Sequence, residues 1–105
     1  MKKTSDEKHL EIKNELIKIK EVLLSKGWVQ GSFTDLYGSH CLLGALDVVS
    51  SSYYDPACLR RHLRGALHNR TKGEVTNLVT FNDAPGRTKE EVISLIDDAI
   101  EFCKG

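Results

Sequence analysis

Features that would place the protein in a membrane or outside the cell are missing from the sequence. No apolar run approaches the roughly 20 residues that a membrane-spanning helix needs. The chain starts with Met-Lys-Lys and polar residues, without the apolar segment of a signal peptide. Cysteine is scarce, and the odd, widely spaced set Cys41, Cys58 and Cys103 does not form a disulfide framework. These absences predict a cytoplasmic protein with no membrane partner.

The sequence also has no excess of charge of either sign, since 15 Lys and Arg residues balance 15 Asp and Glu residues. A neutral chain is not drawn as a whole to polyanions, which argues against a nucleic-acid polymer as partner. Hydrophobic residues make up 40% of the chain, as is typical of a globular protein. Without an internal repeat or linker, the 105 residues are predicted to form a single helical domain, 1–105.

Apolar residues recur with a helical period in several segments. Helices are predicted at about 6–26, 40–49, 56–70 and 89–103. Capping signals precede three of them: Thr4 with Glu7, Asp55 with Pro56, and Thr88 with Glu91. Residues 74–81 fit a helix or a strand, and we favour a helix; a strand is also the alternative for 40–49. Residues 82–86 are predicted to be a turn.

The predicted fold is all-α, a compact bundle of four or five helices, with a short β-ribbon as an option in the loop 27–39. The first helix carries two apolar stripes. One consists of Ile12, Leu16, Ile19 and Leu23, and the other consists of Leu10, Ile17 and Leu24. One stripe is enough to dock a helix on a core. The second stripe predicts that the chain forms a homodimer or higher homo-oligomer through Leu10, Ile17 and Leu24.

Three stretches of the sequence together form a pattern that resembles a known family. They are Gly-Trp-Val-Gln-Gly at 27–31, Cys-Leu-Leu-Gly-Ala-Leu at 41–46, and Phe-Asn-Asp at 81–83 followed by Thr88 and a Glu-Glu-Val-Ile-Ser-Leu-Ile-Asp helix. Their order and spacing resemble a family of short uncharacterised domains of unknown function found in phage and bacterial, especially actinobacterial, genomes. In that pattern the residue before Asn-Asp is usually Trp, where this chain has Phe81. The resemblance implies a phage or mobile-element setting, in which small proteins often bind a host factor or a signalling molecule.

The clearest candidate binding surface is a basic face on the third helix. Arg60, Arg61, Arg64 and His68 share one sector, opposite the apolar residues, and the segment 56–73 has five Lys or Arg residues and no acid. Guanidinium groups suit phosphate or carboxylate. Trp28 is a second candidate for ligand contact, since with Phe33 and Tyr37 in a glycine-rich loop it could stack on a base. The alternatives are a solvated face, or one neutralised by the acidic last helix, and aromatics that cap the core.

Cys41 offers a different chemistry. A thiolate at a helix N-terminus is stabilised by unpaired N–H groups, and His62 and Asp83 could act as its base and orienting group. A buried structural cysteine is the alternative. Cys58 and His62 have the i, i+4 spacing of metal ligands, and His40, Cys41 and His68 could add to them, but no second paired motif is present. No metal and no cofactor are therefore predicted.

The residues together favour a small non-enzymatic binding protein rather than an enzyme, and the resemblance implies that it is phage-related. Its ligand would be anionic: a nucleotide-type small molecule or an acidic surface of a host protein, bound through the basic helix. The absence of a complete acid–base set supports this interpretation. The alternative is a hydrolase or transferase with Cys41 as its nucleophile.

Overall fold

A computed structural model describes residues 5–31, 38–50 and 56–102 and confirms the all-α prediction. Its helices are α1 (Ser5–Lys26), α2 (Leu42–Val49), α3 (Pro56–Thr71), α4 (Leu78–Asp83) and α5 (Lys89–Phe102). The described residues hold no strand, and one isolated bridge joins Trp28 to His40 at the ends of the loop where a β-ribbon was an option; residues 32–37 of that loop lie outside the described residues. None of the described helices is both long and apolar enough to span a bilayer.

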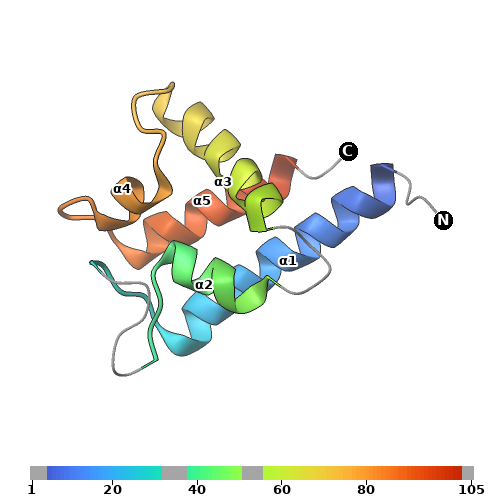
Figure 1. Ribbon diagram of the computed structural model, residues 1–105. Helices are drawn as coiled ribbons and strands as arrows, with labels where there is room; N and C mark the ends of the chain where they lie inside the picture. Colours follow the sequence, from blue (N-terminus) through green and yellow to red (C-terminus); the bar gives the residue numbers. More distant parts are fainter. Residues whose placement is uncertain (1–4, 32–37, 51–55, 103–105) are drawn as a thin grey trace.

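The helices form a bundle in which α5 packs against both α1 and α3, while α2 packs on α1 (Figure 1). The start of α1 and the end of α5 lie at the same end of the bundle, and α4 lies near the opposite end. The short α4 contacts α2 and α3. A single core joins these elements. Its largest fully buried apolar side chains are Leu16, Ile19, Leu23, Leu42, Leu46, Leu59, Leu63, Leu67, Val92, Leu95 and Ile96.

The two stripes of α1 have different environments. The residues of the first stripe, from Ile12 to Leu23, are buried in the core. In the second stripe Leu10 is 57% exposed and Leu24 is 53% exposed, whereas Ile17 is half-buried. The rest of the domain therefore covers only the first stripe, and the second remains on the surface of the monomer.

Helix α1 ends because Gly27 takes a backbone conformation that other residues rarely adopt. Its φ is +99°, and its N–H donates to the carbonyl of Leu23. A Cβ at this position would lie only 2.6 Å from the Ser39 Oγ atom. Glycine is thus required both by the positive φ and by the close approach of the segment that leads into α2.

The last helix begins as predicted from its capping box. The Glu91 N–H donates to the Thr88 hydroxyl, while the Glu91 carboxylate accepts from the Thr88 N–H. The backbone hydrogen bond from Thr88 lowers the pKa of Glu91 from its usual value, with help from the nearby Arg87 guanidinium. The other two capping signals cannot be compared, because Thr4, Asp55 and the Glu7 side chain lie outside the described residues.

The predicted turn at 82–86 is wrong in its first part. Asn82 and Asp83 belong to α4, and the turn begins only at Ala84. The physical reason is the capping side chain of Asn77, which accepts from the N–H groups of Val79 and Thr80 and starts a helix there. Helix α2 also starts later than predicted, at Leu42, and its Val48 is 57% exposed, so it is not buried all round.

Candidate functional site

The side chain of Asn82 is the centre of a buried polar cluster at the end of the bundle near α4. It is 1% exposed. Its Oδ1 atom accepts from the Trp28 indole N–H at 2.7 Å and from the Leu42 N–H at 3.1 Å. Its Nδ2 atom donates to the Val29 carbonyl at 3.1 Å and to the Asp83 carboxylate at 2.9 Å. All the hydrogen-bonding groups of the carboxamide are therefore used inside the protein.

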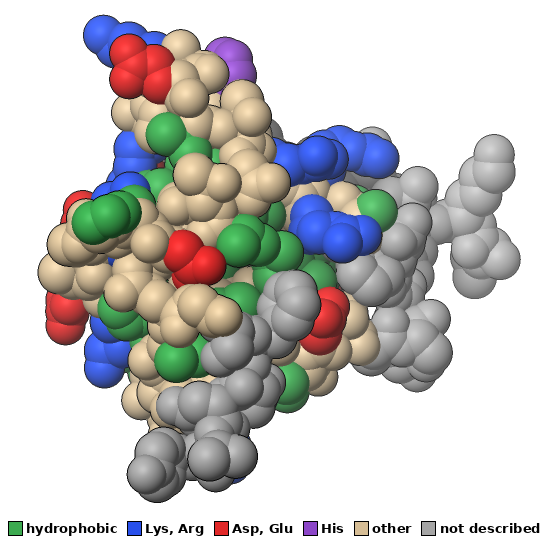
Figure 2. Space-filling model, turned by 60° about the vertical axis from the view of Figure 1, so that its left-hand side comes forward, with side chains coloured by type: hydrophobic (Ala, Val, Ile, Leu, Met, Phe, Trp, Pro, Cys, Tyr) green, Lys and Arg blue, Asp and Glu red, His purple; other side chains and the backbone are tan. Residues whose placement is uncertain are grey.

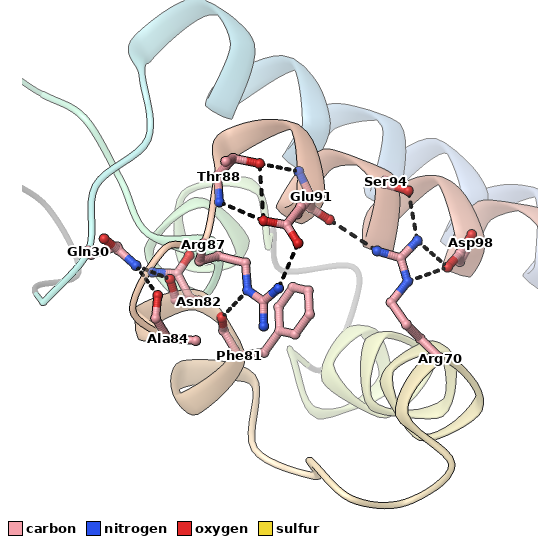
Figure 3. A network of polar contacts seen from close by, with 10 residues as sticks. All are labelled: Gln30, Arg70, Phe81, Asn82, Ala84, Arg87, Thr88, Glu91, Ser94 and Asp98. Atoms are coloured by element: carbon pink, nitrogen blue, oxygen red, sulfur yellow. Dashed lines mark hydrogen bonds and ion pairs between the residues drawn. The ribbon is translucent and has the colours of Figure 1, made fainter.

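Neighbouring residues complete this cluster, which we call the Asn82 clasp. The Gln30 amide donates to the carbonyls of Asn82 and Ala84 at 3.0 and 2.9 Å (Figure 3). The Asp83 carboxylate accepts from the Gly31 N–H at 3.0 Å. The clasp joins the segment after α1, the start of α2 and the end of α4, which are the stretches that carry the family resemblance. The hydrogen bonds of the clasp therefore hold these stretches close together in space.

The sequence predicted Asn82 only as part of a turn and did not predict this role for its side chain. The signal that the sequence offers is an Asn directly after the apolar Phe81, together with the single Trp of the chain far away in the sequence. Spacing alone could not pair residues that are 54 positions apart. The aromatic Trp28 is half-buried against the core, and its indole N–H is already satisfied. Phe33 and Tyr37 lie outside the described residues.

The three residues of the cysteine-nucleophile alternative have separate partners. Cys41 is 5% exposed and is the N-cap of α2, where its sulfur accepts from the Gly44 N–H at 3.3 Å. The His62 Nδ1 atom is 2.9 Å from the Cys58 carbonyl, so it carries a proton and donates to that oxygen. The Asp83 carboxylate belongs to the clasp. The geometry gives Cys41 a helix-capping role.

Alkylation of the cysteines provides a test of this role. We expect Cys58, which is half-buried, to react with iodoacetamide before Cys41 in the folded protein, because the Cys41 sulfur is shielded and hydrogen-bonded. Mass spectrometry of timed samples at neutral pH would give the rate for each cysteine. Denaturant should remove the difference. Rapid labelling of Cys41 without denaturant would contradict the capping role and support the hydrolase or transferase alternative.

No group of three or more His, Cys, Asp or Glu side chains placed to hold a metal ion occurs in the part of the chain that the structure describes. Cys58 and His62 do lie one turn apart on α3, as their spacing requires. The hydrogen bond between them, however, joins the imidazole to the backbone carbonyl of Cys58 and not to its sulfur. The structure thus brings no ligand set together around this pair.

The basic face of α3 is exposed as the sequence predicts. We call Arg60, Arg61, Arg64 and His68 the basic row; all four are exposed. The row borders two hollows. One, the α3 hollow, has a volume of about 460 Å³ and is lined by Arg61, His62, Gly65, His68 and Asn69. The other, the α4 hollow, has a volume of about 300 Å³ and is lined by Leu43, Ala57, Arg60, Arg64, Thr76, Asn77, Leu78 and Val79. Trp28 lines neither hollow.

The acidic last helix could have neutralised this row, but its residues Asp97 and Asp98 pair with other side chains. Arg70 donates to Asp98 at 2.7 Å, to the Ser94 hydroxyl and to the Glu91 carbonyl (Figure 3). Asp97 accepts from Lys20 of α1 at 2.8 Å. In contrast, the three arginines of the basic row form no ion pair with any described residue. The α3–α5 contact therefore uses Arg70 and leaves the positive charge of the row uncompensated.

Figure 2 shows Lys and Arg side chains in groups on one face of the molecule, with hydrophobic atoms exposed beside them. The α4 hollow has this mixed character, because Val79 on its wall is 37% exposed next to two arginines. A surface of this kind can contact both an anionic group and an apolar one.

Comparison with known proteins yields one match. The model of a family described as a family of unknown function (DUF6197) matches residues 7–102, nearly the whole chain. No curated protein and no solved structure shows a significant match. The family match agrees with the resemblance seen in the sequence, and it brings no activity with it.

Proposed function

We propose that this chain, which belongs to the DUF6197 family of unknown function, is a small non-enzymatic binding protein that engages an anionic partner through the basic row of α3. The observation that carries the proposal is the set of arginines Arg60, Arg61 and Arg64, which are exposed and form no ion pair with any described residue. Guanidinium groups in such a setting are available to phosphate or carboxylate.

The contrast with Arg70 supports this choice. Arg70 lies on the same helix and is held by Asp98, Ser94 and the Glu91 carbonyl, so it stabilises the α3–α5 contact. The helix thus separates one structural arginine from three that the fold does not use. Trp28, the other residue predicted to contact a ligand, lines neither hollow beside the row, and its indole N–H is bonded to Asn82 in the clasp. The setting that we propose is cytoplasmic, as the sequence composition predicts, and phage-related, as the resemblance implies.

Charge reversal tests the proposal. In Arg61→Glu and Arg64→Glu we expect binding of an anion to weaken by about tenfold or more, because each lost charged hydrogen bond contributes about 1.5–3 kcal/mol. The probes are inorganic pyrophosphate, ATP and poly-L-glutamate, measured by isothermal titration calorimetry. Melting temperature should change little, since both side chains are exposed. Binding should also weaken as salt is added.

Lys26→Glu is the matched control, because it makes the same change in net charge at an exposed residue outside α3. It should bind each probe like the wild type. If neither these probes nor a protein partner binds in an arginine-dependent way, or if the arginine variants melt at much lower temperature and bind unchanged, the row is a structural feature and the proposed function is wrong.

We also propose that the chain associates with itself through Leu10, Ile17 and Leu24. The support is the exposure of Leu10 and Leu24 on the outer face of α1, where two large apolar side chains remain in water. These residues belong to α1, whereas the basic row belongs to α3.

A further inference from the structure

Gly65 lies in the middle of α3, where glycine has no function within the fold. It is exposed, its φ is not positive, and a Cβ built on it would meet no heavy atom within 4 Å. Glycine in a helix interior destabilises the helix relative to alanine. The described part of the chain therefore gains nothing from glycine at this position, in contrast to Gly27, where the backbone requires it.

The lack of a side chain at Gly65 creates the α3 hollow. The other residues that line this hollow lie about one helical turn before or after Gly65, at positions 61, 62, 68 and 69. All five come from α3, so the hollow is a notch in the outer face of one helix and not a cleft between elements. Its rim carries a guanidinium, two imidazoles and a carboxamide.

The shape of this notch favours a protein over a small molecule. Small-molecule sites enclose most of the ligand surface, which a notch in a single helix cannot do. A second helix needs only a groove into which its ridge of side chains fits, and a small residue at the crossing point lets the two backbones approach closely. The geometry of the notch at Gly65 is therefore that of a helix-crossing site.

The charge of the notch indicates which kind of helix would fit. Arg61 and His68 on its rim belong to the basic row, and no acid occurs between residues 56 and 73. Another copy of α3 would bring the same positive side chains to the contact, so a symmetric α3–α3 pairing is opposed by like charges. The complementary partner is a helix with acidic residues from a different protein.

We infer that Gly65 is the point at which an acidic helix of a partner protein crosses α3, with its carboxylates against Arg61 and Arg64. This inference rests on the proposed function of the basic row and specifies its partner. The ridge of the partner helix sits in the α3 hollow, and Asn69 lies at the rim of the contact.

Replacement of Gly65 gives the first half of the test. Gly65→Ala should raise the melting temperature by about 2–6 °C, because alanine is the better helix former and the added methyl group has free space. The exposed Asn14→Ala on α1 is a control for a gain in helix propensity away from the notch. A lower melting temperature for Gly65→Ala would mean that the fold itself needs glycine there, and the inference would be wrong.

Photo-crosslinking gives the second half. The full chain with Asn69→p-benzoylphenylalanine is expressed in the cells that naturally encode it, irradiated, and purified, and the crosslinked peptide is mapped by mass spectrometry. We expect one partner protein, crosslinked within an acidic helical segment. When Gly65→Ala is added to the chain that carries Asn69→p-benzoylphenylalanine, the yield of crosslinked partner should fall at least about fivefold, because the added methyl group overpacks the contact. Gly65→Gln should reduce that yield further. Thr80→p-benzoylphenylalanine on α4 should not capture this partner.

The outcomes separate this inference from the proposed function. A crosslink that Arg61→Glu removes but Gly65→Ala and Gly65→Gln leave unchanged keeps the basic row as a binding face and overturns the crossing at Gly65. The same holds if no protein is captured while ATP or pyrophosphate binds in an arginine-dependent way. If neither the probes nor a captured protein depends on the arginines, both proposals fail.

Discussion

Replacing Asn82 with alanine should destabilise the protein by about 3–5 kcal/mol, a large part of the 5–15 kcal/mol typical of a small domain. The side chain satisfies the Trp28 indole N–H, the Leu42 N–H and the Val29 carbonyl. Each would lose its partner, and a buried polar group without one costs about 1–3 kcal/mol. The loss of the partner of the Leu42 N–H should cost the most free energy, because this group is buried at the start of α2.

Urea unfolding, followed by circular dichroism and by fluorescence, would measure this loss. The chain has one tryptophan, so the emission reports on Trp28 and on the clasp directly. Two asparagines serve as controls. Asn77→Ala removes a helix cap and should cost about 1 kcal/mol, while Asn14→Ala on the exposed face of α1 should change stability by less than about 0.5 kcal/mol. A loss at Asn82 no larger than that at Asn77 would contradict the central role of the clasp.

Most of the fold could be predicted from local signals. The periodicity of α1, α3 and α5 and the capping box at Thr88 and Glu91 act within a few residues, and the structure confirms them. The segment at 82–83 shows where local signals fail. Asn and Asp favour turns because their side chains bond to nearby backbone, but here Asn82 bonds to three residues of two distant segments and remains helical.

The candidate site was only partly predictable for the same reason. A helical wheel places Arg60, Arg61 and Arg64 opposite the core, and they are exposed. It cannot tell that α5 binds Arg70 instead of them, because that depends on how two helices cross. A glycine inside a helical segment is a local signal that the sequence does offer, but whether Gly65 is needed by the fold depends on its neighbours in space.

The two stripes of α1 should respond very differently to truncation. Leu16→Ala should cost about 2–5 kcal/mol, because Leu16 is 0% exposed and the substitution leaves a cavity between helices. Leu24→Ala is the matched substitution on the same helix, at a side chain that is 53% exposed. In an isolated monomer it should change the free energy of unfolding by less than about 0.5 kcal/mol. Urea unfolding at low protein concentration would compare the two variants.

The dependence of the melting temperature on protein concentration tests whether the second stripe forms an interface between copies. If Leu10, Ile17 and Leu24 form an interface between copies, unfolding and dissociation are linked, so the melting temperature of the wild type rises with concentration. Leu24→Glu should remove that dependence and convert the protein to monomer in sedimentation velocity, because a carboxylate would be buried at the contact. Leu16 cannot report on this, since the core already covers it. A wild type that stays monomeric at high micromolar concentration would mean that the stripe is an exposed apolar surface of the monomer, and self-association would be wrong.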